Sequence, residues 1–254
     1  MHRFFCIFFL FHLSLPVWGQ IPVTAYPDNS PLTEDFVLMG LTEPNRPWTD
    51  ADYRKAVDLL DRIYEADKFS LPRKGSAYSG KIYDRMFNPE NFNFLISENG
   101  NLGNQIIGYE RIKGIGYRLL IYYIEDTEPT ERFGAEVLDC LLLDGWLTMQ
   151  GILLYDALAG QLTQEQLAQS NLRRGFQETA KEYKRSLEEI FYVLEGDYMR
   201  YDVRVLEEYA QRFGAFVEQL PDRTSSTEYR RRLAHLAKKF PDKNIRRILQ
   251  EYVS

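Results

Sequence analysis

Carboxylates are the side chains of this 254-residue chain that are most suited by type to carry out chemistry. Residues 138–147 read LDCLLLDGWL, which places the acid Asp144 inside an apolar stretch that favours a helix. An unpaired carboxylate buried in such a helix is costly. We therefore expect Asp144 to form an ion pair or to bond a tyrosine hydroxyl. The alternatives are a carboxyl that lines a pocket and a slightly displaced helix that leaves the acid solvated.

Two acids acting together can cleave a glycosidic bond without histidine or metal. The composition leaves this chemistry open, because the chain is rich in Asp and Glu. The candidates for such a pair are Asp144, Asp139, Glu98 and Glu110. Nothing in their spacing selects two of them, so a carboxylate-dependent glycan hydrolase remains an alternative function.

Histidine and cysteine are too few for most other active centres. The chain has three His and two Cys, and only His235 and Cys140 remain once the leader described below is removed. A zinc site cannot be built from these two residues, and no nucleophile elbow G-x-S-x-G is present. We expect His235 to pack or to face solvent, Cys140 to be a small buried residue, and the protein to use no metal or cofactor.

Basic residues gather in the long connection 72–91, which reads PRKGSAYSGKIYDRMFNPEN. Its four cations are Arg73, Lys74, Lys81 and Arg85. Long ordered loops often carry binding sites, so this loop is a candidate anion-binding site, with an ordinary surface loop as the alternative. The spacing of GSAYSGKI (75–82) is that of a phosphate-binding loop, but Ile82 stands where Ser or Thr would bind magnesium. We do not expect nucleotide binding.

The end of the chain is also basic. Residues 221–254 carry a net charge of +5, against −12 for residues 20–220. Six of its nine cations are candidate binding residues: Arg230, Arg231, Lys238, Lys239, Arg246 and Arg247. Apolar residues at helical spacing alternate with them. The pattern predicts two short helices with a basic outer face. This face is either simply solvated or binds an anionic surface or an envelope protein; nucleic acid is not expected, because the protein is acidic overall and exported.

The first nineteen residues have the pattern of a secretory signal peptide. Arg3 precedes a short apolar run that ends at Gly19, and this run is too short to cross a bilayer comfortably. We predict export to the periplasm or the extracellular space. No transmembrane segment is expected later in the chain, since even the apolar stretch 133–158 contains four acids.

The remainder predicts an all-α fold, an irregular multi-helix bundle. Five prolines in residues 20–47 indicate an extended N-terminal arm, of which FVLMGL (36–41) docks on the helical domain 48–254. Within 105–125 three glycines weaken a helix, and the composition of YRLLIYYI is typical of a strand, but the length of the segment favours a helix. A small strand or hairpin is the alternative. Helices are expected over residues 50–67, 90–97, 131–158, 163–196, 198–219, 226–239 and 243–252. Their expected capping residues include Thr49 with Asp52, Ser225 with Glu228, and Asp242.

Helix 131–158 is expected to be central, because apolar residues occur on all its sides. On a helical wheel Asp144 falls on the more apolar side, whereas Glu136 and Asp139 fall on the opposite, more polar one. Taken together, the sequence predicts an exported, soluble helical protein that acts as a binding or structural component of the cell envelope. Catalysis is less expected than binding.

Overall fold

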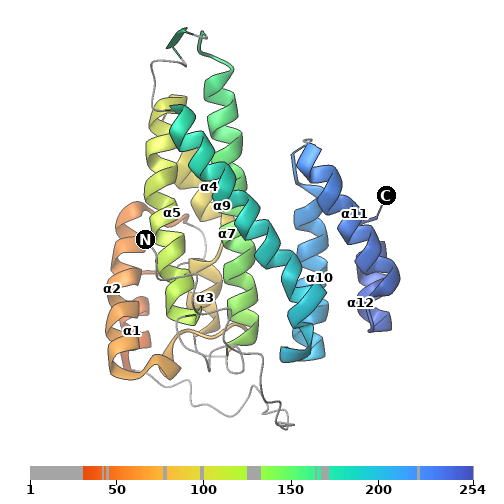
Figure 1. Cartoon of the computed structure of the whole chain (residues 1–254). Helices are drawn as coiled ribbons and strands as arrows, with labels where there is room; N and C mark the ends of the chain where they lie inside the picture. Colours follow the sequence, from red (N-terminus) through yellow and green to blue (C-terminus); the bar gives the residue numbers. More distant parts are fainter. Residues whose placement is uncertain are drawn as a thin grey trace.

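The computed structural model describes residues 31–41, 43, 46–76, 79–97, 100–124, 133–163, 165–166, 172–221 and 224–253. Over these residues the protein is an all-α bundle (Figure 1). The principal helices are α1 (Pro31–Leu38), α2 (Asp50–Asp67), α3 (Gly80–Met86), α4 (Pro89–Ser97), α5 (Leu102–Ile124), α7 (Gly134–Ala159), α9 (Leu172–Tyr192), α10 (Val203–Glu218), α11 (Thr224–Lys239) and α12 (Lys243–Gln250). The predicted fold class is confirmed.

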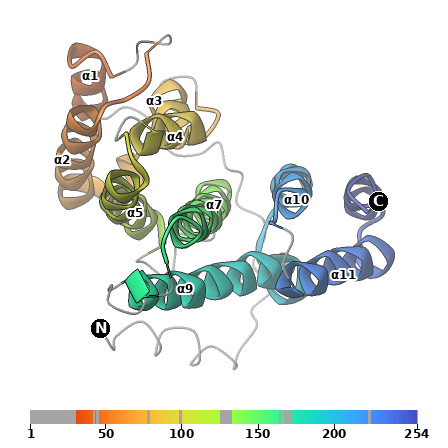
Figure 2. The same cartoon turned by 90° about the horizontal axis from the view of Figure 1, so that it is seen from above.

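Helix α7 lies at the centre, as predicted. Seen from above, it lies between α5 on one side and α10 on the other, with α9 running alongside (Figure 2). Two hydrophobic cores meet on it: Cys140 and Leu147 belong to the core formed with α1–α5, whereas Leu142 and Met149 belong to the core formed with α9–α12. Each half of the bundle therefore buries one side of the same helix.

Helix α7 is the one described helix that is long and apolar enough to cross a membrane. Within the bundle, 67% of its most apolar window is buried against other helices. That burial is typical of the core helix of a helical bundle.

Glycines let the central helices approach closely. Gly116 of α5 packs directly against the Leu147 side chain, and Gly145 of α7 packs against Ile190 of α9. A β-carbon at either glycine would overlap its neighbour. The glycines that weaken the helical prediction for 105–125 are thus partly explained by packing, and the helix α5 is confirmed over a strand or hairpin.

The predicted capping residues are confirmed at the starts of two helices, α2 and α12. Thr49 and Asp52 form the predicted capping box at the start of α2, and the Asp242 side chain accepts from the first amides of α12. Helix α11 instead begins at Thr224, so Ser225 is inside it rather than at its cap. Helix α10 begins later than predicted, because residues 198–200 form a separate 3₁₀ turn.

The N-terminal arm is not extended throughout. Residues 31–38 form α1, with Pro31 at the first helical position, where its missing N–H and fixed φ are tolerated. The predicted docking of 36–41 is confirmed: Phe36 and Leu41 are fully buried, and the Trp48 indole donates to the Leu41 carbonyl at 2.9 Å. Residues 20–30 lie outside the described part of the chain.

Candidate functional site

The loop cations Arg73 and Lys74 fold inward against α7. The Arg73 Nε donates to Glu136 Oε1 at 3.1 Å, and the Lys74 backbone N–H donates to the same oxygen at 2.9 Å. The Arg73 guanidinium also lies over the Phe133 ring, 4.4 Å from its centroid. Since the Glu136 side chain is only 3% exposed, these donors replace the hydrogen bonds to water that the buried carboxylate has lost.

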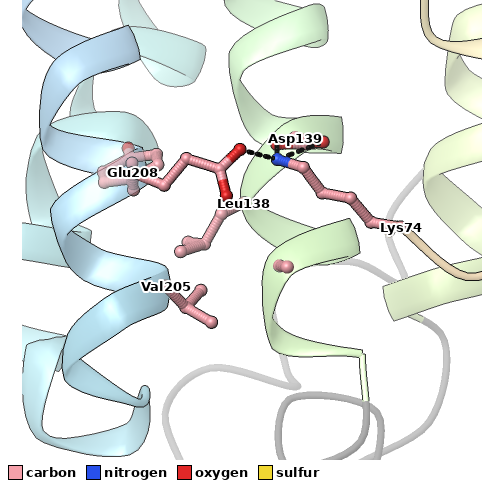
Figure 3. A pocket seen from close by; sticks show the side chains of 7 residues that line it. Lys74, Leu138, Asp139, Val205 and Glu208 are labelled. Atoms are coloured by element: carbon pink, nitrogen blue, oxygen red, sulfur yellow. Dashed lines mark hydrogen bonds and ion pairs between the residues drawn. The ribbon is translucent and has the colours of Figure 1, made fainter. Parts of the chain in front are cut away.

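The Lys74 side chain continues between α7 and α10 (Figure 3). Its ammonium lies 3.1 Å from Asp139 and also pairs with Glu208 of α10. Asp139 accepts in addition from the Tyr83 hydroxyl, at 2.9 Å, and from the Arg212 guanidinium. The oxygens of this acid are therefore fully engaged by protein donors.

A small cavity adjoins this network and is lined by Lys74, Asp139 and Glu208 together with apolar residues of α7 and α10. Its volume is about 10 Å³, which is the space of about one water molecule. Such a cavity cannot admit a sugar ring. These contacts form one ion network, which we call the loop–α7 network; its members are Arg73, Lys74, Glu136, Asp139, Glu208 and Arg212.

Burial controls the acidity of the other groups around this network. Burial, with the Asp139 charge adding to it, raises the pKa of the Tyr83 hydroxyl well above its ordinary value. Burial likewise raises the pKa of the Cys140 thiol. Cys140 is buried and free of disulfides, as expected, and a thiol held in its neutral form is a poor nucleophile.

Asp144 is held in a different way. It is partly buried, and one of its carboxylate oxygens accepts a hydrogen bond from the Ser186 hydroxyl of α9. Burial raises the pKa of this carboxyl, while the Ser186 bond and the nearby Arg185 act against that rise. A protein group does bond this acid, but the donor is Ser186 of α9 and not the cation or tyrosine hydroxyl that the sequence led us to expect.

The helical wheel was wrong about which acids of α7 are the more buried. Glu136 and Asp139, assigned to the polar side, are 2% and 6% exposed and lie deeper than Asp144. The reason is that helices cover α7 on several sides, so no side of it is simply the solvent side. A wheel ranks the faces of a helix but cannot supply its neighbours.

The three candidate acids among the described residues, Asp139, Asp144 and Glu110, are not brought together as a catalytic pair. Asp139 and Asp144 bond partners on different elements, as described above. Glu110 is 44% exposed and is bonded by the Tyr155 hydroxyl at 3.2 Å, with Lys113 at 3.7 Å. Glu98 lies outside the described residues. Neither Asp144 nor Glu110 lines either of the two cavities that we describe.

The four loop cations also have different surroundings. Arg73 and Lys74 belong to the loop–α7 network, whereas Lys81 is exposed on α3. The Arg85 guanidinium donates to the Arg46 carbonyl. The structure thus divides the predicted anion-binding loop into an internal part and an external part.

The C-terminal cations separate into two groups. Arg230 donates to the Leu220 carbonyl at 2.8 Å, and the Arg246 side chain donates to the Phe240 and Pro241 carbonyls. The second group is exposed on α11 and makes no ion pair with any described residue. Its members are Arg231, Lys238 and Lys239, and we call them the α11 basic stripe.

Arg247, predicted to be part of the same basic face, lines a groove between α10 and α12 instead. This groove has a volume of about 620 Å³. Its lining residues are Arg204, Glu207, Glu208 and Gln211 of α10, and Asn244, Arg247, Ile248 and Glu251 of the α12 region. Sequence reasoning missed it, because the polar spacing on each segment does not reveal that the two segments face each other.

No metal cluster is found among the described residues, where no group of three or more His, Cys, Asp or Glu side chains is arranged to hold an ion. Comparisons of the chain with protein-family models, curated proteins and solved structures found no match. We therefore infer the function from the positions and contacts of the charged side chains.

Proposed function

We propose that the protein is an exported binding component of the cell envelope and that it attaches to an anionic lipid surface through the α11 basic stripe. The observation that supports this proposal most directly is the lack of any ion-pair partner for Arg231, Lys238 and Lys239 among the described residues. Cations that serve the fold, such as Arg73 and Lys74, are paired with buried acids. The stripe is thus free for an external partner.

The spacing of the stripe fits a flat surface. Arg231 and Lys238 are seven residues apart, and Lys239 is eight residues from Arg231, so all three project from one side of the helix. The single histidine of the predicted mature chain, His235, is exposed on the same side between them. Each cation near an anionic membrane surface contributes about 1 kcal/mol of binding.

Helix α11 is held firmly enough to present these charges. Its opposite side buries Leu233 and Leu236 in the second core. Arg232 ties it to Glu188 of α9, at 2.9 Å, and to Glu195 in the turn that follows α9, at 2.6 Å. A helix fixed in this way loses little conformational freedom when it binds.

The alternative function, glycan hydrolysis by two acids, is not supported by this geometry. Retaining and inverting hydrolases need two carboxyls about 5 to 9.5 Å apart on either side of a space for sugar. The acids Asp139 and Asp144 are satisfied by protein donors, and the cavity beside Asp139 measures about 10 Å³. We keep the binding role as the better proposal.

Co-sedimentation with vesicles tests the lipid attachment. We expect the mature chain to bind vesicles of mixed phosphatidylcholine and phosphatidylglycerol at low salt. It should not bind vesicles of pure phosphatidylcholine. Lys238→Gln with Lys239→Gln should weaken binding by roughly 30-fold, the equivalent of about 2 kcal/mol. The matched control, Lys181→Gln with Lys184→Gln, removes two exposed charges from α9 and should leave binding unchanged. Equal loss in both variants, or equal binding to both vesicles, contradicts the proposal.

Export is tested separately by fractionating cells that produce the full chain. The mature N-terminus should be Gln20, which mass spectrometry of the protein outside the cytoplasm will show. An intact leader on protein that stays in the cytoplasm overturns the export half of the proposal without affecting the vesicle result.

A further inference from the structure

We propose that Met199 inserts its side chain into the apolar layer of the lipid surface to which the α11 basic stripe attaches. This inference rests on the lipid attachment proposed above and adds an apolar contact to its ionic ones. The starting observation is that Met199 is 84% exposed, which makes it the most exposed large apolar side chain among the described residues.

The fold holds Met199 beside the end of α11. Met199 is the middle residue of the 3₁₀ turn that precedes α10. Its neighbour Tyr198 packs on the ring of Phe240, with the ring centroids 5.0 Å apart. Phe240 directly follows α11, whose last two residues are cations of the α11 basic stripe. The most exposed apolar side chain and two of the three stripe cations therefore lie at the same end of the molecule.

The region around Met199 is basic. Residues 197–204 and 238–243, which we call the α10–α11 tip, carry a net charge of +2. Four cations of the tip are exposed and make no ion pair with a described residue: Arg204, Lys238, Lys239 and Lys243. Anionic headgroups can therefore bind close to Met199.

The acids of the α10–α11 tip are used within the fold. Asp197 pairs with Arg200 at 3.2 Å. Asp202 and Asp242 are N-caps, and their side chains accept from the first amides of α10 and α12. Their charges are offset by Arg200 and by the positive helix starts, so they do not neutralise the four exposed cations.

A bilayer suits this combination of side chains better than a protein partner does. Its anionic headgroups attract the cations, and its acyl chains lie directly beneath the headgroups. Methionine is unbranched and flexible, so it can pack among acyl chains that have no fixed arrangement. A protein surface would need a pocket whose shape matches the protruding side chain.

The inserted side chain adds to the ionic attachment but cannot replace it. We expect Met199 to strengthen vesicle binding about fivefold, because a side chain at the depth of the headgroups loses only part of its contact with water. The cations of the tip remain necessary, so high salt should still release the protein.

Fluorescence from a label at position 199 tests the insertion. Without the predicted leader, Cys140 is the only cysteine of the chain, and it is buried. A cysteine introduced as Met199→Cys can therefore be labelled selectively with the environment-sensitive dye NBD. Vesicles of phosphatidylcholine and phosphatidylglycerol should raise the emission and shift it to shorter wavelengths, and lipids with a doxyl group on the acyl chain should quench it. The same label on Ile107→Cys of α5, at a position that is 70% exposed, should show none of these changes.

Unlabelled variants separate the side chain from the dye. Met199→Ser should weaken co-sedimentation with the anionic vesicles about fivefold, and Met199→Leu should bind like the unchanged protein. Ile107→Ser removes a comparable exposed apolar side chain from α5 and should have no effect. Circular dichroism should show that all three variants stay folded, because neither position is in a hydrophobic core.

The insertion and the lipid attachment fail in different ways. If the protein binds anionic vesicles and Lys238→Gln with Lys239→Gln weakens that binding, but the label at position 199 stays in water, the insertion is wrong and the attachment stands. Equal effects of Met199→Ser and Ile107→Ser also overturn the insertion alone. If the mature chain does not bind anionic vesicles at all, both proposals are overturned.

Discussion

The two basic regions of this protein use the same kind of side chain in opposite ways. In the loop, Arg73 and Lys74 are mostly buried, and their charges are taken up by Glu136, Asp139 and Glu208. On α11, Lys238 and its neighbours are exposed and unpaired within the described chain. The first region joins elements of the fold, and the second is available to bind something outside it.

The difference arises from sequence separation rather than from local composition. The acid partners of Arg73 and Lys74 lie 63 and 65 residues further along, on the central helix. They meet the loop only because α7 is surrounded on several sides. Glu188 and Glu195 are paired with Arg232 of α11, whereas Arg231, Lys238 and Lys239 make no ion pair with a described residue. Whether a cation forms an ion pair thus depends on where the fold places the acids.

The largest expected effect comes from breaking the loop–α7 network. Arg73→Met should lower the free energy of unfolding by about 3 kcal/mol, because it leaves the buried Glu136 carboxylate without its guanidinium. Arg231→Met on the α11 basic stripe should change stability by less than about 0.5 kcal/mol. Urea unfolding followed by circular dichroism measures both.

A double-mutant cycle sharpens this result. Adding Glu136→Gln to Arg73→Met removes the uncompensated charge, so the double variant should recover much of the loss and give a coupling energy of about 1 kcal/mol or more. Similar losses for Arg73→Met and Arg231→Met, or simple additivity of Arg73→Met and Glu136→Gln, would show that the two basic regions do not differ in the way we describe.

Local signals explain the parts of the fold that the sequence predicted well. The α2 capping box and the Asp242 cap depend on side chains within three residues of the amides that they bond. The central place of α7 followed from its apolar residues on all sides. The helix α1 was missed because prolines were taken to exclude every regular element, although Pro31 occupies the one helical position that tolerates it.

The candidate site was much less predictable, for a physical reason. The burial of Asp139 and the pairing of Lys74 depend on contacts between α3, α7 and α10 that no local pattern encodes. The groove between α10 and α12 was equally hidden in the sequence, since Glu207 and Asn244, which bond each other in it, are 37 residues apart. The charge pattern of the sequence identified the candidate charged side chains. Which of them form ion pairs depends on the residues that the fold places beside them.

The third acid of α7 offers a contrast with a smaller expected effect. Asp144 has a hydroxyl partner instead of a cation, and burial raises its pKa above the ordinary 3.8. The folded state therefore holds this proton more tightly than the unfolded state, so the contribution of Asp144 to stability falls as the pH rises between 3.8 and the raised pKa. Its charge opposes folding above that interval.

Asp144→Asn should accordingly stabilise the protein by about 1 kcal/mol at pH 7, since the amide oxygen still accepts from Ser186 and the desolvated charge is gone. The gain should shrink towards zero as the pH falls to 3.8 or below, where both side chains are neutral. Urea unfolding at a series of pH values checks this. A destabilised variant at pH 7, or a gain that grows on acidification, contradicts the account of Asp144.

The smallest expected change in stability concerns salt, and it compares the two basic regions directly. Exposed charges are screened by salt, whereas buried pairs are screened much less. Raising sodium chloride from about 0.05 to 0.5 M should abolish vesicle binding through the α11 basic stripe. The same change should alter the stability cost of Arg73→Met by less than about 0.5 kcal/mol, because the side chains of Arg73 and Glu136 are 12% and 3% exposed. If high salt halves that cost, the loop–α7 network is open to solvent and the two regions are electrostatically alike. If vesicle binding survives high salt, apolar contacts rather than the unpaired cations hold the protein to the surface.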